Sequence, residues 1–124
     1  MVWLAVALGG ALGSVARHAM NVVVHRVAGE PVPYATATVN IIGCFVIGAL
    51  AGLIASGQLR LSETGRAFAF VGILGGFTTF SSLGLDTYTL VRSGEMAIAF
   101  ANLAVQILVG LGSVFAGYRL ATLL

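Results

Sequence analysis

The residues best suited to chemistry gather in one short stretch, residues 72–86, which reads Gly-Ile-Leu-Gly-Gly-Phe-Thr-Thr-Phe-Ser-Ser-Leu-Gly-Leu-Asp. The stretch lies within an apolar segment, at a depth where lipid offers the backbone no hydrogen bonds. Glycine, threonine and serine support a helix interior poorly. Irregular backbone at membrane depth is tolerated only where protein covers it or where it lines a polar cavity. The stretch therefore predicts a helix that is broken at Gly75 and Gly76 and whose hydroxyls, N–H groups and carbonyls can face an ion.

The same residues are compatible with a second interpretation, a helix that packs closely on a neighbour. The glycines would then let two backbones approach, and the hydroxyls would bond back to carbonyls one turn earlier. Taken alone, the stretch favours neither interpretation, and the choice depends on the rest of the chain.

The composition indicates an integral membrane protein. Of the 124 residues, 59% are hydrophobic and 8% are charged, a balance that no soluble domain of this size needs. The formal net charge of +2 is too small and too scattered to suggest nucleic acid as a partner. Cys44 is the single cysteine, so there is no disulfide framework or cysteine metal cluster, and we expect it to be a small buried packing residue.

Four apolar segments are long enough to cross a bilayer, which takes about 20 residues each. They cover residues 2–25, 33–57, 64–91 and 95–123, and form a single four-helix transmembrane domain over residues 1–124. Pro31 and Pro33 predict a loop that leads into the second helix. The connections are short, so neighbouring helices should be antiparallel. No catalytic set of side chains is visible, and we expect that the protein is not an enzyme.

Polar residues recur inside the spans. Arg17 lies well within the first, where an arginine costs about 2.5–3.5 kcal/mol and usually faces a cavity or partner; the alternative is that it reaches the nearer interface. Asn40 is the one strongly polar residue of the second, and is either interhelical glue or an amide donor for an anion. The fourth carries a stripe that is either a packing seam or one wall of a polar path: Asn102, Gln106, Gly110, Ser113 and Gly117.

The basic residues hardly distinguish the two sides of the membrane. One side would carry Arg60, Arg66 and Arg119, and the other Arg26, Arg92 and in one count Arg17. The positive-inside signal is therefore nearly absent. We expect the chain to insert in both orientations (dual topology), and two opposed copies to pair as an antiparallel dimer around a two-fold axis in the membrane plane.

Three ordered motifs resemble the Fluc (CrcB) family of fluoride ion channels. They are residues 9–17 (Gly-Gly-Ala-Leu-Gly-Ser-Val-Ala-Arg), 38–48 (Thr-Val-Asn-Ile-Ile-Gly-Cys-Phe-Val-Ile-Gly) and 72–81 (Gly-Ile-Leu-Gly-Gly-Phe-Thr-Thr-Phe-Ser). The resemblance implies an all-α membrane protein with its third helix broken mid-membrane. It also implies a dual-topology dimer with two pores, which exports cytoplasmic fluoride passively across the inner (plasma) membrane.

The resemblance further assigns roles to residues. The fluoride pore would be formed by Asn40, Thr79, Phe80, Ser81, Leu83 and Gln106, with Arg17 supporting the vestibule. A structural sodium ion (Na+) at the dimer centre would be held by the backbone carbonyls of Gly75 and Thr78. Fluoride is strongly hydrated, so a pore must replace water with donors such as amides and hydroxyls, and aromatic ring edges can also face an anion.

Two positions depart from the family pattern. Leu83 stands where the family usually has a second pore phenylalanine, and Gln106 stands where it usually has serine. Leu83 keeps open a second hypothesis, that the chain is a non-conducting subunit that pairs with a homologous one. A third hypothesis, a proton-coupled small multidrug exporter, needs a carboxylate in the first span. That span has none, and Asp86 lies toward the end of the third.

Overall fold

The computed structural model describes residues 1–29 and 33–124, and these residues form helices joined by short connections. Three of the spans are single long helices: α1 (Val2–Ala28), α2 (Tyr34–Ala55) and α6 (Met96–Thr122). The remaining span, third in chain order, covers Glu63–Arg92. All four are long and apolar enough to cross a membrane, which confirms the prediction of four spans. Pro31, expected in the loop before the second span, lies outside the described residues.

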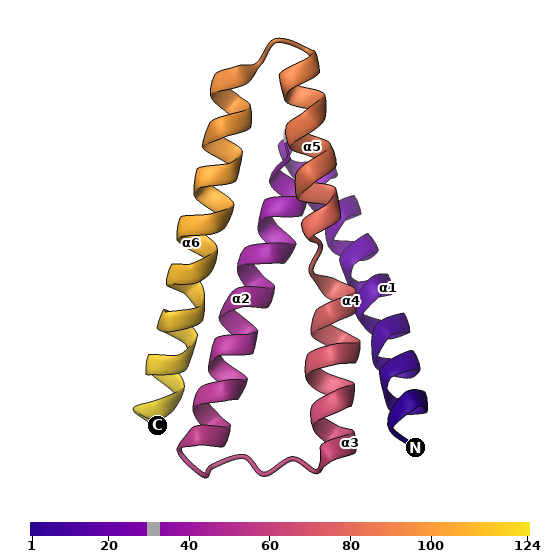
Figure 1. Ribbon diagram of the computed structural model, residues 1–124, viewed down its shortest axis with the longest axis vertical. Coiled ribbons are helices and arrows are strands. Elements are labelled where there is room, and N and C mark those ends of the chain that lie inside the picture. Colours follow the sequence, from indigo (N-terminus) through magenta and orange to yellow (C-terminus); the bar gives the residue numbers. More distant parts are fainter. Residues whose placement is uncertain (30–32) are drawn as a thin grey trace.

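The third span is built from four pieces. It begins with α3 (Glu63–Arg66), continues as the π-helix η1 (Ala67–Leu74) and the short α4 (Gly75–Phe77), and resumes as α5 (Phe80–Arg92). Between α4 and α5, Thr78 (φ −86°, ψ 159°) and Thr79 (φ −155°, ψ 113°) are extended. The predicted interruption of the third helix is therefore present (Figure 1).

The position of this helix break, Thr78 and Thr79, corrects the sequence-based expectation. We expected the chain to open at Gly75 and Gly76, but both glycines are helical. The physical reason is that β-branched threonines favour extended backbone, whereas a glycine in a membrane helix also serves to bring a neighbour close. The π-helix before the break carried no recognisable sequence signal.

The glycines of the third span pack against α1. A Cβ atom added to Gly76 would stand 2.6 Å from the carbonyl oxygen of Gly10, and one added to Gly72 would stand 2.8 Å from the Cα atom of Gly9. A Cβ at Gly13 would collide with the carbonyl oxygen of Ile73. Both interpretations of the stretch are therefore correct in part, because its glycines form a packing seam and its threonines form the break.

A second glycine seam joins α2 to α6, which lie side by side along most of their length (Figure 1). A Cβ atom at Gly52 would stand 2.6 Å from the carbonyl oxygen of Tyr118, and one at Gly48 would collide with the carbonyl oxygen of Val114. Cys44, expected to be buried, is only half-buried. It lies beside Gly110 at the edge of this seam.

The two seams divide the bundle into two helix pairs, α1 with the first half of the third span, and α2 with α6. Beyond the break, α5 leans across to contact α6. Both chain termini lie at the same end as the connection from α2 to α3 (Figure 1). The break thus lies where the third span leaves one pair and joins the other.

The α2–α6 seam gives a stability prediction with a control on the same helix. A Cβ atom at Gly117 would collide with the carbonyl oxygen of Phe45 and lie 2.9 Å from the amide nitrogen of Ala49, whereas one at Gly112 meets nothing within 4 Å. We expect Gly117→Ala to destabilise the protein by about 1–3 kcal/mol, as overpacking usually does. Gly112→Ala should be neutral or slightly stabilising. Thermal unfolding of both variants in detergent, followed by circular dichroism, checks this; equal melting would contradict the seam.

Candidate ion site at the helix break

The side chain of Asn40 on α2 reaches across to the break and pairs with the backbone of one residue there. Its Oδ1 atom accepts a hydrogen bond from the Thr79 N–H (2.8 Å), and its Nδ2 atom donates to the Thr79 carbonyl oxygen (3.1 Å). In a continuous helix the Thr79 N–H would donate to the carbonyl of Gly75. The amide therefore replaces the helical partners that Thr79 loses.

Two further side-chain amides on α6 extend this contact into a chain of three, which we call the amide chain: Asn40, Gln106 and Asn102. The Nδ2 atom of Asn40 donates to Oε1 of Gln106 (2.7 Å), and Nε2 of Gln106 donates to Oδ1 of Asn102 (2.8 Å). Gln106 and Asn102 are both buried. The Nδ2 atom of Asn102 is buried as well and has no hydrogen-bond partner among the described residues.

Threonine hydroxyls complete the two helix ends at the break. The Thr79 hydroxyl oxygen accepts from the Ser82 N–H (3.2 Å) and so caps α5, and it also donates to the Ser82 Oγ atom (3.0 Å). The Thr78 hydroxyl donates to the carbonyl of Leu74 (2.9 Å) at the end of α4. The Oγ atom of Ser81 lies 3.2 Å from the Thr79 hydroxyl oxygen, and Ser81 is exposed.

A cavity of about 380 Å³, which we call the break cavity, adjoins these groups. Five of the six predicted pore residues line it: Asn40, Thr79, Phe80, Leu83 and Gln106. The remaining wall includes Gly43, Cys44, Ile47, Phe70, Leu74, Gly75, Thr78 and Ile107. Ser81, the sixth, is not part of the lining and adjoins it through Thr79. The structure therefore brings the predicted residues together around one partly polar space.

The two positions of the expected aromatic pair differ sharply in exposure. Phe80 is 81% exposed although it borders the break cavity, while Leu83 is 4% exposed and is packed into the wall of that cavity. The two side chains, three residues apart on α5, thus share one cavity but not one environment. The exposed Phe80 ring is available to a second copy of the chain.

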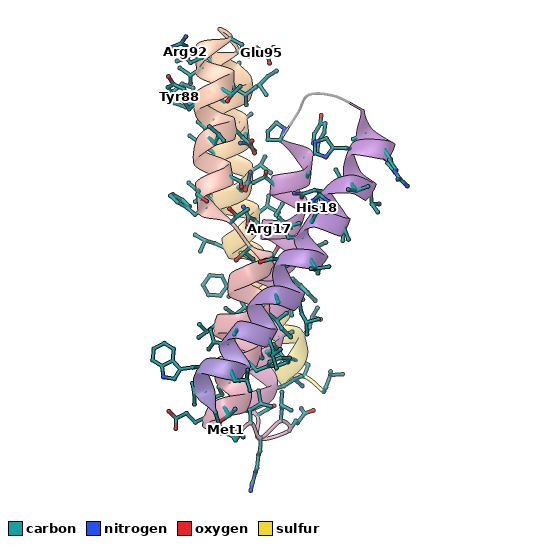
Figure 2. All side chains as sticks on the ribbon, turned by 90° about the vertical axis from the view of Figure 1, so that its right-hand side faces the viewer. Met1, Arg17, His18, Tyr88, Arg92 and Glu95 are labelled. Carbon is teal, nitrogen blue, oxygen red and sulfur yellow. The ribbon has the colours of Figure 1, made fainter. Side chains whose placement is uncertain are left out.

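Arg17 lies beside the break and not at an end of its helix. It is half-buried on α1, and its Nη1 atom is 3.5 Å from the carbonyl oxygen of Thr78. Figure 2 shows Arg17 near the middle of the molecule, at the level where the third span is interrupted. Of the two alternatives for this residue, the structure supports the one in which it faces a partner inside the bundle.

The carbonyls assigned to sodium were tested against the backbone around the break. The Thr79 N–H donates to a side-chain oxygen and not to the carbonyl of Gly75, and the Ser82 N–H donates to the Thr79 hydroxyl and not to the carbonyl of Thr78. Both carbonyl oxygens are thus released from the helical ladder. Hard cations prefer such oxygen ligands. The Gly75 carbonyl therefore fits a sodium ion, whereas the Thr78 carbonyl would have to share its oxygen with the guanidinium of Arg17, 3.5 Å away. Two oxygens from one chain also form an incomplete shell.

A second polar cavity, of about 370 Å³, lies beyond the break between α1, α2 and α5. Polar side chains in its wall are those of Asn21, His25, Thr36, Ser82, Asp86 and Thr89. The Oδ2 atom of Asp86 and the Oδ1 atom of Asn21 are buried there without a hydrogen-bond partner among the described residues. Asp86, the acidic residue of α5, therefore faces a different space from the amide chain.

The predicted pore residues did not include Asn102, which the structure joins to the site through Gln106. The signal was present, because Asn102 precedes Gln106 by one helical turn and so shares its face of α6. The structure shows the packing seam of the α6 stripe, while its role as one wall of a polar path stays a prediction. The stripe is a packing seam at Gly110 and Gly117, and it is one wall of a polar space at Gln106, which lines the break cavity.

Comparisons with known proteins identify the family. Residues 4–118 match the family model of "CrcB-like protein, Camphor Resistance (CrcB)". A protein of Opitutus terrae named "Fluoride-specific ion channel FluC" is 43% identical over 94% of this chain and 89% of its own length. Proteins with the same name from Rhodospirillum centenum and Methylobacillus flagellatus are each 48% identical, over 94% and 93% of this chain and 92% and 90% of theirs. The chain therefore belongs to the CrcB-like family, as the three sequence motifs predicted.

Proposed function

We propose that this protein is a fluoride-selective channel whose pores pass along the break cavity. The relatives that it resembles over nearly their whole length are named as fluoride-specific ion channels. That membership also confirms the prediction that the protein is not an enzyme. The four spans make it a multi-pass membrane protein, and we place it in the inner (plasma) membrane.

The observation that carries the proposal is the chemistry of the break cavity. Its described lining combines two amides and two hydroxyls with apolar side chains and includes no acidic residue. The guanidinium of Arg17 lies on the Thr78 carbonyl at the same break. Burying an unpaired anion is costly, so a passage for fluoride needs donors and a positive potential and must avoid carboxylates. The described lining has no carboxylate, Arg17 places a positive charge beside the break, and the Nε2 atom of Gln106 keeps one hydrogen that none of the described hydrogen bonds uses.

Pairing of two copies completes the pathway. Phe80 is exposed on its own chain but borders the cavity, so in an antiparallel dimer its ring can reach the cavity of the partner. Two break cavities related by a two-fold axis would then give two pores. A sodium ion at that axis would be held by the Gly75 and Thr78 carbonyls of each copy. When bound, it would supply a fixed positive charge that ties the two breaks together.

Flow through such a pore is passive and follows the electrochemical gradient of fluoride. No residue at the break cavity would need to bind or release a proton during transport, because its described lining holds amides, hydroxyls, backbone groups and one thiol, and no carboxylate or histidine. Inside a cell that has trapped fluoride as an anion, the gradient favours its exit. The channel would therefore export fluoride without a coupled energy source.

The test of the proposal is fluoride efflux from liposomes that contain the purified chain. Liposomes loaded with potassium fluoride and supplied with a potassium ionophore should release fluoride rapidly, as a fluoride electrode records. The same liposomes loaded with potassium chloride should retain chloride. Protein-free liposomes give the background. Equal release of both halides would refute selectivity, and background-level fluoride release from folded, dimeric protein would refute conduction by this chain alone.

The positive charge of Arg17 should raise the rate at which fluoride enters the pore. At about 10 Å and an effective dielectric constant of about 20, a unit charge attracts an anion by about 1.7 kcal/mol. We expect Arg17→Gln to lower fluoride efflux by roughly tenfold. Arg119→Gln, in the last turn of α6, removes an equal charge far from the break and should leave efflux near wild type. If both variants conduct like wild type, Arg17 does not act on the ion.

Dual topology predicts a symmetric labelling pattern. In a Cys44→Ser background, a cysteine at exposed Ser56 marks one end of the bundle, and a cysteine at exposed Ser93 marks the other. Because the basic residues give almost no orientation signal, a membrane-impermeant maleimide added to intact cells should label about half of each variant. Labelling confined to one of the two positions would contradict the antiparallel dimer.

A further inference from the structure

The amide chain has a direction that the backbone fixes. Amide oxygen and nitrogen atoms are easily interchanged in a structure, and their assignment depends on the surrounding hydrogen bonds. Here the Thr79 N–H can only donate, so the atom of Asn40 that faces it at 2.8 Å must be the oxygen Oδ1. The Nδ2 atom of Asn40 must then face the Thr79 carbonyl and Gln106.

This direction uses every hydrogen that Asn40 can donate. A side-chain amide carries two N–H hydrogens. One is directed to the Thr79 carbonyl oxygen at 3.1 Å and the other to Oε1 of Gln106 at 2.7 Å. An anion could receive a hydrogen bond from Asn40 only if one of these acceptors lost its own. By contrast, the Nδ2 atom at the other end of the chain, on Asn102, has no partner among the described residues.

We propose that Asn40 is a positioning residue that holds Thr79 in its extended conformation and does not itself donate to the permeating anion. The inference rests on the proposed function and replaces the direct-donor role that the sequence suggested for Asn40. Its side chain acts on the pore through the Thr79 backbone, which in turn places the hydroxyl cap of α5 and the exposed Phe80 ring. Fluoride would meet donors other than this amide.

The first test observes the asparagine side chains directly. The chain contains three asparagines, Asn21, Asn40 and Asn102, so isotope-labelled asparagine gives three NH₂ signals in a nuclear magnetic resonance spectrum of the protein in lipid bilayers. Substitution of each in turn assigns them. On titration with fluoride against matched chloride, we expect the Asn40 signal to stay in place and to show no fluorine–proton contact. A saturable fluoride-dependent shift together with such a contact at Asn40 would overturn the proposal.

The second test needs no fluoride. Hydrogen exchange of the Thr79 N–H should accelerate by at least about tenfold in Asn40→Leu, which loses the acceptor, since a tenfold change corresponds to about 1.4 kcal/mol. Asn40→Asp keeps an oxygen that accepts from the Thr79 N–H, so this N–H should stay protected from exchange. The comparison of the two variants separates a positioning role of Asn40 from general unfolding. Gln58→Leu, at an exposed amide far from the break, is the control. Unchanged Thr79 exchange in a folded Asn40→Leu variant would overturn the proposal. Absence of fluoride efflux from wild type would instead refute the proposed function and leave this readout intact.

Discussion

Replacing Asn40 with aspartate is expected to slow fluoride efflux by at least about 100-fold. The carboxylate can still accept from the Thr79 N–H, so the break should form, but it cannot donate to the Thr79 carbonyl or to Gln106. It also puts a negative charge in the wall of the break cavity. At about 5 Å and an effective dielectric constant of about 20, repulsion of an anion amounts to about 3 kcal/mol, which corresponds to about 100-fold.

The measurement is the liposome efflux assay, made on protein that elutes as a dimer. Gln58→Glu is the matched control, because it makes the same amide-to-acid change at an exposed position near the end of α2. We expect the control to conduct like wild type. Efflux through Asn40→Asp within a factor of about two of wild type, that is, a difference of less than about 0.5 kcal/mol, would show that fluoride does not pass this wall of the cavity.

The sequence was sufficient for the number of spans because hydropathy depends only on composition along a segment. It was not sufficient for the position of the break, because glycine in a membrane helix has two uses. Gly75 and Gly76 suggested an opening, yet Gly76 is held against Gly10 of α1, and the chain opens two residues later at Thr78. Only the packing of α1 on the third span separates the two uses.

The site could be predicted as a set of residues but not as a set of contacts. Asn40, Thr79 and Gln106 were all expected near an ion path, and they line one cavity. Nothing in the sequence indicated that the hydrogens of Asn40 would be used on Thr79 and Gln106, because hydrogen-bond direction depends on which backbone group faces the amide. The contact of Arg17 with the Thr78 carbonyl likewise requires the break itself, which exposes that carbonyl to a neighbouring helix.

Leu83 bears on whether the chain works as a homodimer. It lines the break cavity together with Phe80, but its side chain is aliphatic and has no ring edge to present to an anion. In a homodimer this loss would apply to both pores. The chain would then either conduct at a reduced rate through the retained amides, hydroxyls and Phe80 rings, or depend on a homologous subunit that supplies the missing phenylalanine.

We expect the homodimer to conduct and Leu83→Phe to increase fluoride efflux by about 2- to 12-fold. Two aromatic rings in contact gain about 0.5–1.5 kcal/mol beyond their buried area. A contribution of the same order from a ring edge that faces the anion corresponds to that range. Leu83 is 4% exposed, but the cavity of about 380 Å³ beside it gives a ring room to turn without displacing the wall. The comparison is made in the liposome efflux assay at equal protein density.

The control for added aromatic bulk is Leu85→Phe, two residues further along α5, where the side chain is 65% exposed and is not part of the cavity lining. That variant should conduct like wild type. The retained residues argue for the homodimer, since Asn40 and Thr79 hold the break in place, Gln106 lines the cavity, and Phe80 remains available to a partner. If wild type is silent alone and becomes active when it is co-expressed with a homologous subunit, the homodimer is not the conducting unit. Leu83 would then mark this chain as one half of a heterodimeric channel.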